Sequence, residues 1–484
     1  PKADRLYDPI THVKLMNEEK MNGWILQGFN VLNSLPNKNK TENSIVVYAD
    51  KGANVTVNED FVVNAQVKSK IPTSGTSTQN AGGVYATGEN TLVTLGSTTP
   101  NTNIEVEGAD ILNTSGKSTG DKAGFGLFAD KGAQIKAVGT GGSSTVKVKN
   151  GSAAVVSLGD TATSTTSKVD LTKATVDYDG EGYALYTDKA SGSGKDAINM
   201  TNATLKLRGK AVGYVNDRNN KGAVNLTNTK IEVYDNDVII ADLKDTSGTK
   251  VVVNVENKTT PGDSLKDQLL GGTGISVVDK TKSAPNGTYK YAVVDNATIN
   301  IKANIDKGDN TKDNEVFTKR FLYQNSIINV DNTGSVKAEL NSAQLASINP
   351  KLTAPVGLAV TASANSTDVV STGINNKGTI SADRTDLTDK GGIGLYVDYG
   401  FINNETSGIV NIEKGSVNGP NKKGIGIYGT NSTKIKNDGK INAAGEKSIG
   451  ILGLSYRINS KTGLVYDPSQ EEYYNNKVVT NLEM

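Results

Sequence analysis

The sequence predicts an all-β fold: a right-handed parallel β-helix with three short strands per coil, an N-terminal cap-like segment and insertions. Three observations lead there: a glycine-flanked strand that recurs at regular intervals, alternating apolar and polar runs between its copies, and a composition poor in aromatic residues. The 484 residues are 36% hydrophobic and 5% aromatic, with 52 Gly and 11 Pro. Stacked coils need mainly small apolar side chains inside, so this composition suits a repetitive fold better than several compact cores.

The glycine-flanked strand is the first element of the repeat. Its clear copies combine Gly with apolar residues and lie at 82–85, 124–128, 182–186, 392–396, 424–428 and 448–452, with weaker copies at 154–156, 211–214 and 238–240. Five successive copies end at Phe128, Val156, Tyr186, Tyr214 and Ile240, which are 28, 30, 28 and 26 residues apart. This regularity predicts that equivalent positions stack, with Tyr and Phe in ladders along the coil axis.

Two further elements complete each coil. Short runs such as 169–171 with 175–177 read apolar, polar, apolar, which is the period of a strand with one buried face. An Asn-x-Gly-x-aliphatic unit recurs at 332–336, 376–380 and 437–441. Because Asn and Gly tolerate positive φ, we expect this unit at tight corners, where stacked Asn side chains could form amide ladders. The general abundance of Asn is read as compositional and given no mechanistic weight.

Four segments are expected in chain order. Residues 1–45 form an N-terminal cap or helical segment, in which Met21, Ile25, Phe29 and Leu32 have the spacing of one helix face. Residues 46–242 form regular coils, residues 243–355 form irregular coils with protruding insertions, and residues 356–484 form coils with Gly-Ile-Gly-Ile-Tyr repeats and an irregular end. Within the third segment, short helices are predicted at 264–270 and 314–323. Stretches rich in Ser, Thr and Gly, such as 69–80 and 115–121, are expected to be loops.

Departures from the repeat are where partner binding is expected, because loops can vary while a stacked core cannot. The candidate partner-binding residues are Trp24, Phe317, Phe321 and Tyr323. The alternative is structural: Trp24 would help to cover the end of the coil stack, and the other three side chains would be the buried feet of an insertion.

Composition argues against many kinds of enzyme. The chain has one histidine, His12, and no cysteine, which excludes Ser-His-Asp hydrolysis within the repeats, thiol chemistry and multi-histidine metal sites. We therefore expect no enzyme, no cofactor and no metal. The balance of 52 basic and 51 acidic residues gives a net charge of +1, so no nucleic-acid partner is expected.

A β-helical polysaccharide lyase or glycosidase is the enzymatic alternative. Glycoside hydrolysis uses paired carboxylates, whereas a calcium-assisted lyase needs acidic ligands beside an Arg or Lys base. The pairs Asp177 with Asp179 and Asp235 with Asp237 are candidates, as is the group Asp383, Asp386 and Asp389. Arg208 and Arg218 lie near the coil that contains Asp235, but spacing alone does not bring these groups together. Residues 177–181 could bind calcium, although they lack a complete EF-hand loop.

The Gly-Ile-Gly-Ile-Tyr strand at 424–428, followed by the Asn-x-Gly-x-Ile turn at 437–441, resembles the passenger domains of large fusobacterial type V autotransporter adhesins. The resemblance is densest over 356–455 and recognisable over 82–241. It implies an adhesin passenger segment on the outer face of the bacterial outer membrane, monomeric, with membrane attachment only through a C-terminal barrel absent from this sequence. It also implies as partners a host Ig-like receptor, a galactose-type glycan or other bacteria. The alternative is a structural spacer stalk of a longer adhesin.

Overall fold

The structure, a computed structural model, is all-β with parallel sheets and few helices, as the sequence predicts at this level. The chain divides into two compact units: unit 1 is Pro1–Thr249 with Gly271–Ser283, and unit 2 is Lys250–Leu270 with Ala284–Met484. The described residues are 41–57, 61–77, 79–96, 102–138, 144–159, 165–187, 195–215, 223–235, 237–243, 250–257, 265–280, 292–308, 322–348, 354–362, 371–386, 391–412, 424–431, 433–445, 447–454 and 482–483.

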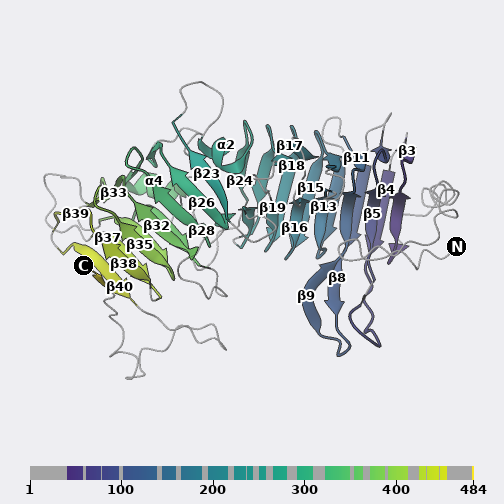
Figure 1. Cartoon of the computed structure of the whole chain (residues 1–484), viewed down its shortest axis with the longest axis horizontal. Coiled ribbons are helices and arrows are strands. Elements are labelled where there is room, and N and C mark those ends of the chain that lie inside the picture. The colour runs from purple at the N-terminus through teal and green to yellow at the C-terminus, as the bar shows by residue number, and fades with distance from the viewer. Residues whose placement is uncertain are drawn as a thin grey trace. The chain divides into compact units, whose positions relative to one another are not determined.

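Unit 1 contains three parallel sheets that successive strands enter in turn (Figure 1). Sheet A1 consists of β1 (Thr41–Glu42), β4 (Phe61–Gln66), β7 (Thr102–Glu107), β12 (Thr145–Lys149), β15 (Thr175–Gly180), β18 (Thr204–Gly209), β21 (Lys230–Val233) and β24 (Ser276–Asp279). Sheet B1 consists of β2 (Ile45–Ala49), β5 (Gly82–Thr87), β10 (Phe125–Asp130), β13 (Ala153–Ser157), β16 (Tyr183–Thr187), β19 (Val212–Val215) and β22 (Ile239–Asp242). Sheet C1 consists of β3 (Asn54–Val57), β6 (Leu92–Leu95), β11 (Gln134–Lys136), β14 (Lys168–Asp170), β17 (Lys195–Asn199) and β20 (Ala223–Asn225). We call three successive strands, one from each sheet, a rung.

Rows of small apolar side chains hold the rungs of unit 1 together. In sheet A1, Val146 pairs with Ile104 on one side and with Val176 on the other. All three side chains are at most 1% exposed. The polar residues between them on each strand point outward, as the period of two predicts. Each row therefore removes apolar area from water, which is the main stabilising contribution to such a stack.

The predicted aromatic ladder is confirmed in both units. In unit 1, the rings of Tyr48 and Tyr85 have centroids 5.5 Å apart, and those of Tyr85 and Phe128 are 5.1 Å apart. In unit 2, Tyr396 and Tyr428 are 5.3 Å apart. The prediction is wrong for Tyr214, which pairs with Leu185 instead of Tyr186 and is fully buried. Counting residues between copies misses a register change of one position, which sends a side chain to the other face of the strand.

Unit 2 is built in the same way from three parallel sheets. Sheet A2 consists of β23 (Val251–Val255), β26 (Ala297–Ile301), β29 (Ile327–Val330), β32 (Gly373–Asn376), β35 (Phe401–Asn404), β38 (Lys434–Asn437) and β41 (Leu482–Glu483). Sheet B2 consists of β25 (Ala292–Asp295), β28 (Leu322–Gln324), β31 (Val356–Thr361), β34 (Ile393–Asp398), β37 (Ile425–Thr430) and β40 (Ile449–Leu454). Sheet C2 consists of β27 (Asn304–Asp306), β30 (Ser335–Leu340), β33 (Thr379–Arg384), β36 (Ile409–Ile412) and β39 (Lys440–Ala443).

The corner glycines of unit 2 serve close packing of neighbouring rungs. A Cβ atom on Gly378 would lie 2.2 Å from the carbonyl oxygen of Gly334, and one on Gly334 would lie 2.3 Å from that of Ile301. Neither glycine has a positive φ. The prediction of glycine at these corners is confirmed, but its physical reason is different: close backbone approach, and not left-handed geometry, excludes a side chain.

Among the described residues of unit 2 are two short helices, α2 (Leu265–Leu270) and α4 (Ser342–Ile348). Helix α2 confirms the prediction at 264–270. In the helix predicted at 314–323, residues 314–321 lie outside the described part of the chain, and the last two residues belong to strand β28. Helix α4 begins with a reciprocal cap in which the Gln344 backbone N–H donates to Asn341 Oδ1 at 2.8 Å and the Asn341 N–H donates to Gln344 Oε1 at 2.9 Å.

An antiparallel hairpin interrupts the rungs of unit 1 between β7 and β10. Its strands are β8 (Ala109–Leu112) and β9 (Ser118–Ala123), and we call residues 109–123 the arm. Figure 1 shows the arm leaving the edge of the stacked strands. The sequence analysis expects a loop at 115–121, which is wrong for 118–121 because these residues continue a paired strand.

Candidate binding surfaces

The structure describes one of the four residues predicted to bind a partner. Trp24, Phe317 and Phe321 lie outside the described residues. Tyr323 lies in strand β28 and is 1% exposed. Burial raises the pKa of its hydroxyl well above the ordinary value. Tyr323 therefore belongs to the core of unit 2 and is not available to a partner, in agreement with the structural alternative for this residue.

A row of asparagines runs along the outer face of sheet A2. Asn300 donates through Nδ2 to Asn254 Oδ1 at 2.9 Å, and Asn329 donates in the same way to Asn300 at 2.8 Å. Asn375 donates to Asn329 and Asn403 donates to Asn375, each at 2.9 Å. We call these five residues the amide ladder. Each ladder amide inside the row uses one N–H and one oxygen lone pair, so a second N–H and a second lone pair remain for other partners.

The ladder follows from strand register. Asn300 pairs with Asn329, Asn329 with Asn375 and Asn375 with Asn403 along parallel strands. Neighbouring side chains such as Ile299 and Ile328 point inward and are fully buried. Equivalent outward positions on adjacent strands are about 4.8 Å apart, which lets one amide reach the next.

A groove of about 430 Å³ lies over the ladder. Its lining combines three ladder amides with charged side chains of both signs: Asn300, Lys302, Asn329, Val330, Asp331, Asn375, Lys377 and Glu405. Lys302 Nζ lies 3.3 Å from Glu256 Oε1, and Lys377 Nζ lies 3.5 Å from Glu405 Oε2. Two lysines and two carboxylates in the lining leave the groove without net charge, although it is rich in hydrogen-bonding groups.

The groove was not predicted from the sequence, because the abundance of asparagine was interpreted as compositional. The signal was present in the apolar-Asn-apolar triplets at 299–301 and 328–330, which recur at the rung spacing. A polar residue kept at the same outward strand position over several rungs indicates a built surface.

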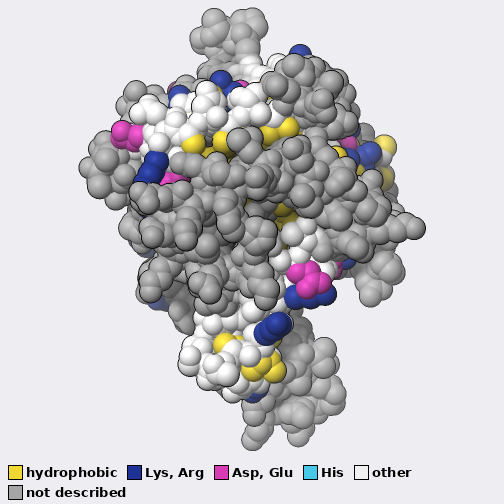
Figure 2. Space-filling view, turned by 90° about the vertical axis from the view of Figure 1, so that its right-hand side faces the viewer, with side chains coloured by type: hydrophobic (Ala, Val, Ile, Leu, Met, Phe, Trp, Pro, Cys, Tyr) yellow, Lys and Arg dark blue, Asp and Glu magenta, His cyan; other side chains and the backbone are white. Residues whose placement is uncertain are grey.

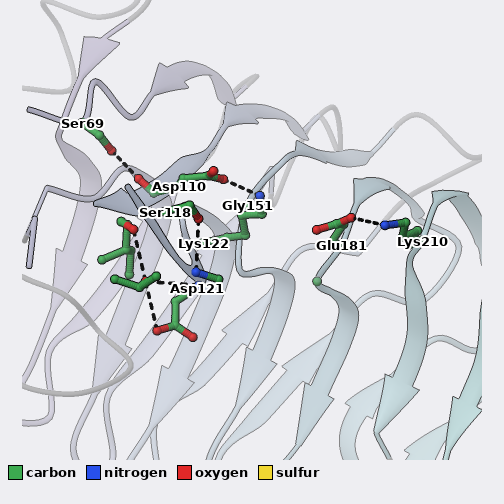
Figure 3. A network of polar contacts seen from close by, with 12 residues as sticks. Ser69, Asp110, Ser118, Asp121, Lys122, Gly151, Glu181 and Lys210 are labelled. Atoms are coloured by element: carbon green, nitrogen blue, oxygen red, sulfur yellow. Dashed lines mark hydrogen bonds and ion pairs between the residues drawn. The ribbon is translucent and has the colours of Figure 1, made fainter. Parts of the chain in front are cut away.

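A second polar surface is the base of the arm in unit 1 (Figure 3). The Lys122 ammonium forms an ion pair with the Asp110 carboxylate across the two strands, and Ser69 Oγ donates to the Asp110 carbonyl oxygen at 2.8 Å. The hydrogen bond from Lys122 holds the pKa of the Asp110 carboxyl below its usual value. On the outer strand, Thr119 donates to the carbonyl oxygen of Ile111 at 3.1 Å.

Most side chains of the arm strand β9 are exposed. The neighbouring Ile71 is 63% exposed, and its side chain lies against the turn of the arm at Gly116. Figure 2 shows the arm region projecting below the stacked strands, with apolar side chains in yellow and basic side chains in blue. The arm therefore offers a small mixed surface.

A pH-dependent change in the stability of the arm follows from Asp110. Its carboxyl has a lower pKa in the folded state, so the stabilising contribution is complete above the ordinary value of 3.8 and is lost as pH falls below it. We expect hydrogen-exchange protection of residues 109–123 to drop below about pH 4 in wild type. Asp110→Asn should remove this pH dependence, and an unchanged acid-induced drop in that variant would contradict the assignment.

The acidic clusters considered for catalysis are only partly brought together. Arg208 Nε lies 3.0 Å from Asp177 Oδ1, and its guanidinium carbon lies 3.6 Å from the centre of the Tyr234 ring. The backbone N–H of Gly209 donates to Asp235 Oδ2 at 2.7 Å. Arg208 is thus held by an ion pair and a cation–π contact. Within the described residues, no group of three or more His, Cys, Asp or Glu side chains could hold a metal ion.

Lys307 in unit 2 is a half-buried lysine whose ammonium group is turned toward the backbone. Its Nζ donates to the carbonyl oxygen of Val356 at 3.0 Å, and burial lowers its pKa to about 7. Between pH 7 and 10.5 this lysine is protonated in the unfolded chain, where its pKa is 10.5, and largely deprotonated in the folded protein. We therefore expect this group to make the free energy of unfolding rise between pH 7 and 10.5, and Lys307→Met to reduce that rise. Denaturant titrations of both proteins at several pH values test this, and equal slopes would contradict it.

Comparisons with known proteins find two matches, both over a short N-terminal stretch. Over 41 residues the chain is 93% identical to the formate dehydrogenase major subunit of Haemophilus influenzae, a match that covers 8% of this chain and 4% of that subunit. Over 40 residues it is 52% identical to the formate dehydrogenase-O major subunit of Escherichia coli, with the same coverage. The chain spans about 4% of the length of these relatives. No family profile and no solved structure matches the chain.

These matches correct two expectations. The resemblance to fusobacterial autotransporter adhesins is wrong as a family assignment, since the comparisons lead to formate dehydrogenase subunits and to no adhesin. Glycine-flanked strands and Asn-Gly corners are requirements of stacked rungs, so they indicate architecture without ancestry. The expectation that the chain is not an enzyme is contradicted by the same N-terminal stretch, which covers 8% of the chain.

The described residues contain no helix that is both long and apolar enough to cross a membrane.

Proposed function

We propose that this protein is an adhesin displayed on a bacterial surface, in which a right-handed parallel β-helix with three strands per coil presents a glycan-binding groove. The observation that carries the proposal is the groove over the amide ladder, because it combines a built row of hydrogen-bonding groups with a volume of about 430 Å³. The right-handed sense is supported by the general preference of connections between parallel strands.

The chemistry of the groove favours a neutral glycan. Sugar hydroxyls both donate and accept hydrogen bonds, and so do the free N–H and lone pair of each ladder amide. Lys302 and Lys377 are each paired with a carboxylate, which leaves little excess positive charge for a sulfated or sialylated chain. The ladder repeats at about 4.8 Å, so successive sugar units could contact successive rungs.

Glycan binding by the groove is tested with the double variant Asn329→Leu/Asn375→Leu. We expect wild type to bind an immobilised galactose-terminated neutral oligosaccharide and the variant to lose about tenfold or more in affinity, since at least two hydrogen bonds are removed. Surface plasmon resonance measures both, with a sulfated oligosaccharide as the comparison ligand.

The matched control is Asn442→Leu, which changes an exposed asparagine amide that does not line the groove. This control should bind as wild type does. Equal affinity of the double variant and wild type would rule out the groove as the binding site. Failure of wild type to bind any neutral oligosaccharide would favour the spacer alternative, in which the stacked rungs only hold a distal region away from the cell.

A second candidate function is formate dehydrogenase activity, favoured by the 93% identity over 41 N-terminal residues. This second proposal rests on a stretch that corresponds to 4% of the Haemophilus influenzae subunit. Formate-dependent reduction of an artificial electron acceptor by the purified protein tests it: activity above that of a heat-denatured sample would support this function, and its absence would count against it.

A further inference from the structure

Three side chains of complementary chemistry meet in unit 2. Lys250 directly precedes β23, Asp295 ends β25, and Asn325 lies between β28 and β29. The Lys250 Nζ contacts the backbone oxygen of Asn325, 75 residues away in sequence. Asn325 Nδ2 donates to Asp295 Oδ1 at 2.9 Å, and Asp295 is 8% exposed. The amine therefore lies against the backbone of Asn325, and the carboxamide of the same residue lies against a buried carboxylate.

Backbone hydrogen bonds fix this arrangement. The Asn325 N–H donates to the carbonyl oxygen of Thr361 at 2.9 Å, and the N–H of Asn296, which follows Asp295, donates to Gln324 at 3.2 Å. Lys250 Nζ contacts the main-chain oxygen of Asn325, and Cγ of the carboxamide belongs to the same residue. Lys250 Nζ is thus held against the residue that carries the carboxamide, and holding two groups in the same place favours reaction between them.

We propose that Lys250 and Asn325 become joined by an isopeptide bond, with Asp295 as the proton carrier. The Lys250 ammonium gives one proton to the Asp295 carboxylate, and the lone pair of the neutral Nζ attacks Cγ of Asn325. The Cγ–Nδ2 bond breaks as the Nζ–Cγ amide forms. Asp295 returns its proton to the leaving nitrogen, which also takes the proton lost by Nζ and departs as ammonium. No oxidant or further reactant is needed.

Asp295 is well placed for this role because it already contacts Nδ2, the atom that leaves. The product would link the segment before β23 to the corner between β28 and β29 and close a covalent loop across several rungs. A bond at this position resists the separation of neighbouring rungs and is independent of any ligand, so this inference does not rest on the proposed function.

Intact-mass spectrometry of the purified, denatured full chain tests the proposal. Wild type should be lighter than the mass calculated from its sequence by about 17 Da, the mass of ammonia. A tryptic digest should yield one branched peptide that joins the segments containing Lys250 and Asn325. Lys250→Arg and Asn325→Leu should each restore the full calculated mass, and Asp295→Asn should leave most of the chain unlinked.

Lys302→Arg is the matched control, because it changes a lysine of the same unit whose Nζ lies beside Glu256. This variant should keep the loss of mass. The wild-type measurement decides the question even where a variant fails to fold. Full calculated mass with linear peptides, or a bond from Lys250 to another residue such as Asn296, would overturn the proposal.

Discussion

Replacing Gly394 by Ala is expected to lower the free energy of unfolding of unit 2 by about 1–3 kcal/mol. Gly394 lies in β34, and a Cβ atom there would be 2.4 Å from Cγ1 of Val410 and 2.5 Å from the carbonyl oxygen of Gly426. The second contact is with the backbone of the next strand, which cannot move without disturbing the hydrogen bonds between β34 and β37. This strain outweighs the 0.4–1 kcal/mol or so that alanine gains by restricting the unfolded chain.

The matched control is Gly450→Ala, at the equivalent position of strand β40. A Cβ atom on Gly450 would have no heavy atom within 4 Å. We expect this variant to unfold within about 0.5 kcal/mol of wild type. Equilibrium denaturation followed by far-ultraviolet circular dichroism measures both, and similar losses for the two variants would show that glycine at this position serves something other than packing.

The same glycines show what the sequence could predict. The repeat of Gly-flanked strands places Gly394, Gly426 and Gly450 in one row, and the structure confirms the row. A periodic pattern reports positions that every rung shares, and for this reason the all-β class and the aromatic ladder were accessible. The pattern cannot report a change of register, which is why Tyr214 was assigned to the wrong row.

Features that interrupt or decorate the repeat were harder to predict. Strand β9 of the arm has the polar sequence Ser-Thr-Gly-Asp-Lys-Ala, which carries no apolar period of two, and it pairs with β8 through contacts such as the ion pair between Asp110 and Lys122. The groove depends on asparagines that carry no signal as single residues. They form a continuous hydrogen-bonding surface only because strand register aligns them across successive rungs. Tyr323, predicted to bind a partner, is buried instead, because its ring is large and apolar enough to pack inside the stack.

Asn404→Ala should lower the free energy of unfolding of unit 2 by about 2–4 kcal/mol. Asn404 is 1% exposed, donates through Nδ2 to Asn437 Oδ1 at 2.7 Å and accepts from Asn376 Nδ2 at 2.8 Å. These three residues form the corner ladder that the Asn-x-Gly units predict, with Asn404 as an unpredicted middle member. Alanine would remove both hydrogen bonds and leave the fully buried Asn376 amide without its acceptor.

Asn442→Ala provides the comparison, since Asn442 Nδ2 donates to Asn411 Oδ1 at a similar 2.7 Å but in an exposed pair. Water can replace the lost partner there, so we expect a change of no more than about 0.5 kcal/mol. The difference between the two variants isolates the effect of burial on an otherwise equal amide contact. Equal losses would mean that the inner ladder stabilises the rungs no more than a solvated one does, and that the corner glycines alone hold these strands in register.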